Sequence, residues 1–242
     1  PPVSPQPRSG YLSRALRLLQ DRRRRQGLLF DWYERWDRRC QPEAARALAP
    51  VDCSALLRGV ERLEVTPQRK GFVQRFPPEA LVAIREKDLD VLLRFGFGIL
   101  RGDILHCARY GVWSYHHGDN DYYRGGPAHF WELYERNPLS GVMLQVLTEQ
   151  LDAGRVLCRA FLATEPGLSL VCNRLRPYLT AVPFVIAKLH ELHQLGWDHV
   201  ERRMVPPQTY RGRRTLYRKP TNLEMCGFLA PRLAGKPFWL ES

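Results

Sequence analysis

The chain has 242 residues, of which 44% are hydrophobic and 26% charged, as is ordinary for a soluble globular protein. No run approaches the roughly 20 apolar residues that a membrane-spanning helix needs. The first residues lack the basic-then-apolar order of a signal peptide, so we expect a cytoplasmic protein with no membrane partner. The net charge of +12 comes almost entirely from arginines spread along the whole chain, so it does not by itself indicate a nucleic-acid partner.

The distribution of basic residues and cysteines argues against two common kinds of site. The densest basic run, Arg22 to Arg25, is typical of a solvated helix face, and nucleic-acid binding ranks last among the functions considered. The six cysteines are scattered singly without CxxC or CxxH spacing. We therefore expect free thiols in a reducing compartment and no metal site.

The predicted elements begin as helix and continue as alternating strands and helices. Residues 1–10 are Pro-rich and are expected to be disordered, and residues 11–39 have the apolar period of a helix. The predicted strands are 60–65, 89–97, 111–116, 141–149 and 155–164. The predicted helices are 77–88, 101–110, 128–136 and 169–196, the last one interrupted near Pro177 and Pro183.

This alternation predicts an α/β fold with a mostly parallel, Rossmann-type sheet, helices on both faces and a helical N-terminal extension. We divide the chain into a Pro-rich and helical start (1–54), an α/β domain (55–197) and a basic, Pro-rich tail (198–242) with a short hairpin near residues 213–219. Ligands of such sheets bind beyond the carboxyl ends of the strands. The loops that follow Phe97 and His116 are expected at such ends.

Residues 111–157 carry most of the functional signal, with the sequence GVWSYHHGDNDYYRGGPAHFWELYERNPLSGVMLQVLTEQLDAGRVL. A short apolar strand ends at a histidine, and a polar loop ends at Tyr123-Arg124-Gly125. A helix and a second strand follow, and then Leu151-Asp152-Ala153-Gly154. This order brings a histidine and a carboxylate from two strand ends toward one crevice, which suits proton handling during group transfer.

The pattern resembles the active-site half of the folate-dependent formyltransferases, which include methionyl-tRNA, glycinamide ribonucleotide and sugar-amine formyltransferases. That family has Asn-x-His, a loop to (Tyr/Trp)-Arg-Gly, a Thr-Gly-Val-Thr strand and Asp-x-Gly. The resemblance covers about residues 60–164. It implies a formyltransferase-like fold and transfer of a formyl group from 10-formyltetrahydrofolate to a primary amine of a small-molecule acceptor. It implies no metal, because the folate supplies the activated one-carbon unit.

The resemblance also implies a role for three residues. Aligned on Tyr123-Arg124-Gly125, the family's histidine falls on His116, which would interact with the formyl oxygen. Its carboxylate falls on Asp152, which would take the proton from the attacking amine, with Glu149 as the alternative. The family's asparagine two residues before the histidine is Ser114 here, whose hydroxyl also donates but has a shorter reach.

Two further segments complete the expected site. The run RFGFGIL resembles the segment whose backbone lies along the pterin ring of the donor, which gives the cofactor-binding residues Phe95, Gly96, Phe97, Gly98, Ile99 and Leu100. The expected substrate-binding residues are His117, Asp119, Arg124 and Gly125. The adjacent His117 leaves the register of the histidine open by one residue, although strand alternation directs the two rings oppositely.

One departure from the family leaves alternatives open. The strand and Gly-rich turn that begin the family's fold have no counterpart before residue 60. The chain is then a fragment or mis-started product, a rearranged member whose N-terminal helices cover the sheet edge, or a degenerate relative. The alternative functions are a weakened or inactive folate- or partner-binding protein and a formyl-folate hydrolase. The sequence determines neither the acceptor nor the oligomeric state.

Overall fold

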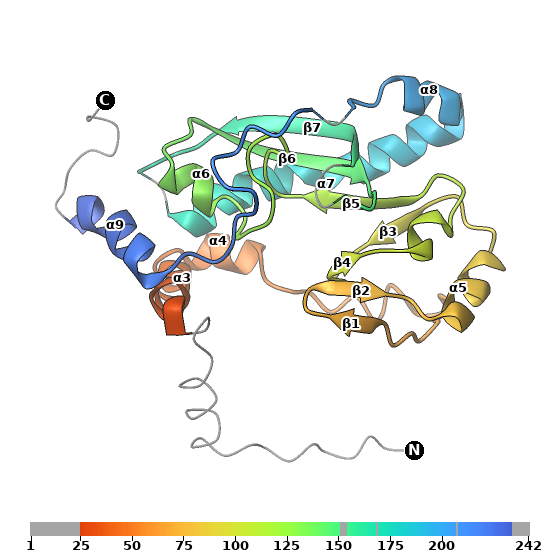
Figure 1. Cartoon of the computed structure of the whole chain (residues 1–242), viewed down its shortest axis with the longest axis horizontal. Coiled ribbons are helices and arrows are strands. Elements are labelled where there is room, and N and C mark those ends of the chain that lie inside the picture. The colour runs from red at the N-terminus through yellow and green to blue at the C-terminus, as the bar shows by residue number, and fades with distance from the viewer. Residues whose placement is uncertain (1–24, 151–153, 168, 207, 234–242) are drawn as a thin grey trace, which may run out of the picture.

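The computed structural model describes residues 25–150, 154–167, 169–206 and 208–233 (Figure 1). The strands are β1 (Gln68–Lys70), β2 (Val73–Arg75), β3 (Leu92–Arg94), β4 (Ile99–Leu100), β5 (Val112–His116), β6 (Leu139–Val146) and β7 (Arg155–Ala163). The helices are α3 (Leu28–Cys40), α4 (Pro42–Ala47), α5 (Pro78–Arg85), the short 3₁₀ helix η1 (Asp103–His106), α6 (Phe130–Tyr134), α7 (Leu170–Leu195), α8 (Trp197–Arg202) and α9 (Asn222–Leu233).

The larger sheet has the strand order β3-β5-β6-β7. β3 runs parallel to β5, whereas β5, β6 and β7 are antiparallel to one another. The predicted α/β architecture with a helical N-terminal part is confirmed, but the strand directions are mixed rather than mostly parallel. The short connection between β6 and β7 explains part of this difference, because parallel neighbours need a long crossover.

Side chains of β5 alternate between two covered faces of this sheet. Trp113 and Tyr115 point to the face on which α7 packs, where Trp113 shares a core cluster with Leu144 and Leu157. Figure 1 shows α7 running along that face. Val112 lies on the opposite face, in a second core cluster that α5 and η1 complete. Helices therefore cover the sheet on both sides, and the polar residues of β5 share a face with Val112.

The N-terminal helix and the C-terminal part of the chain meet in a third core cluster around α6. Phe30 of α3 packs edge-on to Phe130 of α6, with ring centroids 5.3 Å apart, and Phe228 of α9 lies 4.9 Å from the same ring. The buried Asp37 side chain accepts a hydrogen bond of 2.8 Å from the Val171 amide in the first turn of α7. The division of the chain at residues 54 and 197 stays a prediction, since helices from both ends share this cluster with the middle of the chain.

Two expected strands differ from the structure. Residues 60–65 have no regular secondary structure and pair with no strand in the described part of the chain, and the nearby hairpin is instead β1–β2. The segment 213–219 is not a hairpin, because Tyr217 bridges to Gly125. In both segments tertiary context outweighs the local strand preference.

Helix α7 is continuous where an interruption at Pro177 and Pro183 was expected. The hydroxyl of Tyr115 accepts a hydrogen bond of 3.2 Å from the Val185 amide, next to the turn that Pro183 distorts. A side chain from β5 thus supplies a partner where the proline disturbs the helical ladder. Neither α7 nor any other helix in the described ranges is long and apolar enough to cross a membrane.

The core position of Trp113 gives a prediction for stability. Its side chain is fully buried, whereas Trp32 on α3 is 53% exposed. We expect Trp113→Ala to lower the free energy of unfolding by about 3–5 kcal/mol, because it leaves a cavity between the sheet and α7. The matched change Trp32→Ala should cost less than about 1 kcal/mol. Urea unfolding measures both, and equal losses would contradict this packing.

Candidate active site

The carboxyl end of β5 places Ser114 and His116 on one face of the sheet. Both side chains are buried, and Ser114 lies opposite Gln145 while His116 lies opposite Met143 on β6. His116 Nε2 is 2.9 Å from the backbone oxygen of Tyr123. Because a carbonyl only accepts, Nε2 carries a hydrogen. The other ring nitrogen, Nδ1, therefore donates to a ligand only when the ring is protonated.

The loop after β5 folds back over the histidine through a turn at Asp119. The Asp119 carboxylate accepts from the Asp121 amide at 2.9 Å, and its backbone oxygen accepts from Tyr123. The backbone of Asp119 passes so close to Gly141 that a Cβ there would lie 2.9 Å from the Asp119 Cα. Burial raises the pKa of Asp119. The glycine of β6 thus lets the loop settle against the sheet beside His116.

A buried amide pair continues the polar surface on this face. Asn120 donates from Nδ2 to Gln145 Oε1 over 2.6 Å, and both side chains are buried. Gln145 interrupts the apolar run from Val142 to Val146 of β6, and this pair explains its presence there. A narrow depression beside the pair is lined by Asp121, Arg124 and Arg159.

Arg94, the last residue of β3, links Ser114 to the loop that follows. Its Nη1 donates to Ser114 Oγ over 2.8 Å. Its Nη2 donates to the Phe97 oxygen over 2.7 Å, and its Nε donates to the Gly98 oxygen over 3.1 Å. The guanidinium therefore fixes both the turn at residues 95–98 and the hydroxyl of Ser114.

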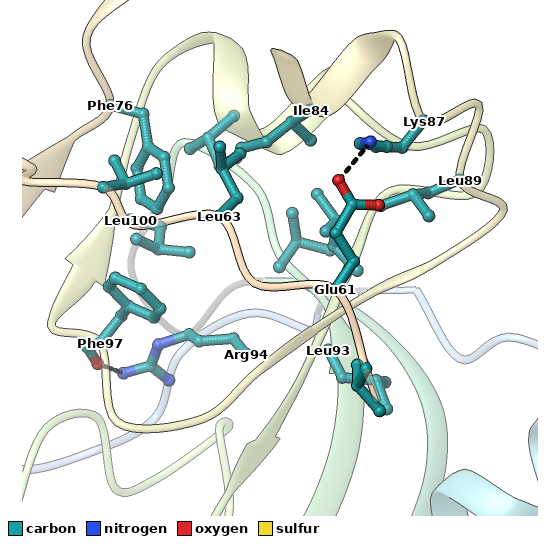
Figure 2. A pocket seen from close by; sticks show the side chains of 15 residues that line it. Glu61, Leu63, Phe76, Ile84, Lys87, Leu89, Leu93, Arg94, Phe97 and Leu100 are labelled. Atoms are coloured by element: carbon teal, nitrogen blue, oxygen red, sulfur yellow. Dashed lines mark hydrogen bonds and ion pairs between the residues drawn. The ribbon is translucent and has the colours of Figure 1, made fainter. Parts of the chain in front are cut away.

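An apolar cavity of about 600 Å³ begins at this arginine (Figure 2). Its walls come from α5, β3, β4, η1, Val112 of β5 and residues 60–65. In Figure 2, Leu63 points into the cavity toward Ile84, and the ion pair between Lys87 and Glu61 closes one side at 2.6 Å. Volumes of roughly 300–1,000 Å³ with mostly apolar walls are typical of small-molecule sites.

The predicted cofactor-binding segment borders this cavity only in part. Phe97 and Leu100 line it, whereas the 62% exposed Phe95 lies on the other face beside Tyr115. The amide of Ile99 is occupied by β2, because it donates to the Phe72 oxygen over 2.8 Å. Strand alternation directs the backbone polar groups of Leu100 to the opposite edge from β2. The cofactor-binding assignments themselves stay predictions.

The loop before the predicted carboxylate is anchored to the same region. Glu149 accepts from the Gly102 amide over 2.7 Å, and Arg101 donates to the Glu149 backbone oxygen. These contacts tie the alternative carboxylate to the start of η1 and place the loop after β6 beside β4. Asp152 lies outside the described residues.

The predicted substrate-binding residues lie in different environments. His117 points away from His116 and packs on Tyr178 of α7, with ring centroids 3.9 Å apart. Arg124 donates to the Asn120 oxygen over 3.2 Å and lies over the Tyr210 ring. Gly125 has a φ of 98°, and a Cβ there would lie 2.3 Å from the Tyr217 oxygen. Asp119 therefore lies near His116, Arg124 lies farther along the same loop, and His117 lies on the other face of the sheet.

A second group of titratable residues, the His129 cluster, consists of His117, His129, Glu132 and Tyr178. The His129 side chain is fully buried and Glu132 is 1% exposed, and His129 Nδ1 lies 3.7 Å from Glu132 Oε1. Burial lowers the pKa of His129 well below its usual value and raises the pKa of Glu132 to about 8. Both groups are therefore neutral at pH 7, and this contact is not an ion pair. Neither the His129 cluster nor the role of Arg94 was anticipated from the sequence.

Metal ligation has no support among the residues that the structure describes, where no group of three or more His, Cys, Asp or Glu side chains could hold an ion. The described residues of this face offer acid–base groups, hydrogen-bond donors and the cavity. Of these, the strand end with Ser114 and His116 is the part that sequence reasoning located.

No family model and no curated protein matches the chain. Three solved structures that resemble it are formyl-transfer or folate-bound proteins. HypX from Aquifex aeolicus in complex with tetrahydrofolic acid is 18% identical, with a TM-score of 0.41 over 58% of this chain and 24% of that one. Phosphoribosylglycinamide formyltransferase from Bacillus halodurans is 18% identical, with a TM-score of 0.45 over 50% of this chain and 62% of that one.

The third is the formyltransferase PseJ from Anoxybacillus kamchatkensis in complex with UDP-4,6-dideoxy-4-formamido-L-AltNAc and tetrahydrofolate. It is 16% identical, with a TM-score of 0.37 over 52% of this chain and 65% of that one. The chain thus spans 24% of HypX and 62% of the phosphoribosylglycinamide enzyme. With TM-scores of 0.45 or less, any activity has to be inferred from this chain's own residues.

The raised pKa of Glu132 gives a prediction for stability against pH. The folded protein keeps this proton up to about pH 8, whereas the unfolded chain releases it near its ordinary value of 4.5. The free energy of unfolding should therefore fall as the pH rises between these values. In Glu132→Gln, which is neutral at every pH, this fall should be smaller by on the order of a few kcal/mol.

Urea unfolding between about pH 5 and pH 8 measures this difference. The exposed Glu79 of α5 supplies the matched control, since Glu79→Gln should follow the pH dependence of the wild type. If Glu132→Gln and the wild type lose stability equally with rising pH, Glu132 is ionised in the folded protein and the assignment is wrong.

Proposed function

We propose that this protein transfers a formyl group from 10-formyltetrahydrofolate to the primary amine of a small molecule. The observation that supports it most is the continuity of one sheet face. Val112 lines the apolar cavity, and Ser114 and His116 follow it at alternate positions of β5. At about 3.3 Å per residue, Val112 in the cavity wall lies roughly 13 Å from His116 along the strand. A folate whose ring lies in the cavity and whose formyl-bearing arm reaches the histidine spans a distance of this order.

The cavity suits the ring system of the donor. Its walls are mostly leucine, isoleucine, valine and phenylalanine, which can cover the faces of a ring, whereas the polar edge of a pterin needs hydrogen-bonding groups at the margin. Arg94 at its edge and the ion pair of Glu61 with Lys87 supply polar groups at the margin. The cavity would hold the ring of the donor by apolar contacts, and the formyl-bearing arm would extend toward the carboxyl end of β5.

The chemistry is assigned to His116 and Asp152. The amine nitrogen attacks the formyl carbon, the π electrons of the carbonyl move to oxygen, and the amine proton passes to Asp152. The electron pair on oxygen then re-forms the carbonyl as the bond between the formyl carbon and folate N10 breaks, and Asp152 returns its proton to N10. A protonated His116 offsets the charge that develops on the oxygen, because its Nδ1–H then donates while Nε2–H stays on the Tyr123 carbonyl.

The acceptor is proposed to enter from the side of the polar loop. Asp119, Asp121 and Arg124 lie there with Arg159 of β7, whose guanidinium is 3.8 Å from Asp121. Such mixed charge fits an acceptor that carries both an amine and hydroxyl or anionic groups. A small polar amine is therefore the class of acceptor to screen.

The donor site is tested by calorimetric titration with a dideaza analogue of 10-formyltetrahydrofolate that does not hydrolyse. We expect micromolar binding by the wild type and roughly tenfold weaker binding by His116→Ala, which loses a hydrogen bond to the formyl oxygen. His190→Ala, an exposed histidine on α7, should bind like the wild type. A folded wild-type protein that does not bind the analogue would contradict the proposal.

Turnover separates the roles of the two residues. We expect Asp152→Asn to bind the analogue almost as the wild type does but to convert 10-formyltetrahydrofolate at least about 100-fold more slowly, because the proton acceptor is lost. The rate of tetrahydrofolate formation with and without candidate amines measures this. Equal rates with and without every amine would favour a hydrolase, and binding without turnover a donor-binding protein.

A further inference from the structure

Arg94 stands where the donor cavity meets the reactive strand end. It lines the cavity, and it donates hydrogen bonds to Ser114 and to the backbone oxygens of Phe97 and Gly98. In Figure 2 its guanidinium lies beside Phe97 at the edge of the cavity. A full positive charge is thus held in one orientation beside the path from the cavity to His116.

The hydrogen bonds of Ser114 indicate what this charge does. The hydroxyl group accepts a hydrogen bond of 2.8 Å from Arg94 and donates one of 3.2 Å to the backbone oxygen of Tyr115. The second distance is long, since O–H···O bonds cluster near 2.7–2.8 Å. A hydroxyl that accepts from a cation becomes a stronger donor itself, because bonds in a chain polarise one another. Rotation of the hydroxyl from its weak partner to a better acceptor is therefore favoured.

We propose that Arg94 is a positioning residue for the formyl group and acts through Ser114. The guanidinium holds the Ser114 oxygen and polarises the hydroxyl, which then donates to the formyl oxygen opposite His116. The proposal rests on the formyl-transfer function given above and deepens it. It assigns the donor role on this strand to a two-residue unit, arginine and serine, in place of a single amide side chain.

A purely structural role for Arg94 predicts something different. The contacts to Phe97 and Gly98 support the turn at residues 95–98, so the loss of Arg94 would disturb the cavity for any folate. The uncharged side chain of Gln74 also supports this turn, because its Oε1 accepts a hydrogen bond of 2.6 Å from the Gly98 amide. Gln74→Ala therefore reproduces the structural effect alone.

The test compares two ligands on one set of full-length variants. Calorimetry gives the affinity for the dideaza formyl analogue and for the same dideazafolate without its formyl group, and their ratio measures recognition of the formyl oxygen. We expect a ratio of roughly 100 in the wild type, about tenfold from each of the hydrogen bonds that His116 and Ser114 donate to the formyl oxygen. The ratio should fall to about ten in Arg94→Ala and in Ser114→Ala, where the His116 hydrogen bond remains.

Three further variants complete the experiment. The double variant should be no worse than either single one, because the two residues act as a unit. Gln74→Ala should weaken both ligands alike and keep the ratio, and Arg94→Lys, which retains the charge, should keep part of it. Should Arg94→Ala fail to fold, as a thermal melt would show, Ser114→Ala and Arg94→Lys decide the question.

The outcomes separate this inference from the proposed function. If the wild type binds neither ligand, the proposed function fails and this inference fails with it. If the wild type binds both ligands equally, or if Arg94→Ala and Ser114→Ala keep the wild-type ratio, the donor site stands but the role of Arg94 is overturned. A ratio lowered about tenfold in both variants, together with the wild-type ratio in Gln74→Ala, supports it.

Discussion

The register of β5 is the constraint on which the rest of the site depends. The strand is paired on both edges, parallel to β3 and antiparallel to β6, and the fully buried Trp113 fixes it against α7. A slip of one residue would exchange the faces of every side chain. His117 would then replace His116 beside the polar loop, and Ser114 would lose Arg94. The large indole on one face thus determines which histidine is presented on the other.

Local signals located the strand and its reactive end, but not the groups that act on them. The apolar run before His116 and the polar loop after it are visible in the sequence because strand alternation and turn composition are local properties. The contact between Arg94 and Ser114 joins residues on two parallel strands, and the bridge between Gly125 and Tyr217 joins loops far apart in the chain. Such contacts depend on tertiary pairing, and no local pattern encodes them. The local apolar pattern of residues 60–65 predicted a strand, but they have no strand partner in the described part of the chain. A local pattern does not encode whether a partner strand is available.

Two groups of buried polar residues lie near β5, and their electrostatics differ. In the His129 cluster, burial keeps both His129 and Glu132 uncharged, so their contact adds no net charge to the interior. Arg94 instead stays charged at the cavity edge, where three oxygen acceptors and partial exposure offset its desolvation. The first arrangement suits a core that must pack, and the second suits a site that must stabilise developing negative charge. This contrast is the reason why the proposed reaction is placed on the face of Ser114 and His116 rather than on the side of His117.

In the proposed site, the groups that bind the donor lie on paired strands, whereas the group that takes the proton lies on a connection between strands. The cavity, Arg94, Ser114 and His116 are built on strands whose positions are fixed by pairing and by buried side chains. The proposed proton acceptor, Asp152, belongs instead to the connection between β6 and β7, which Glu149 anchors at its start by a hydrogen bond with the Gly102 amide. A change in that connection could remove proton transfer while the donor cavity stays intact. A transferase and a binding protein that has lost turnover can therefore share this framework, and the difference between them is concentrated at one carboxylate and the short connection that carries it.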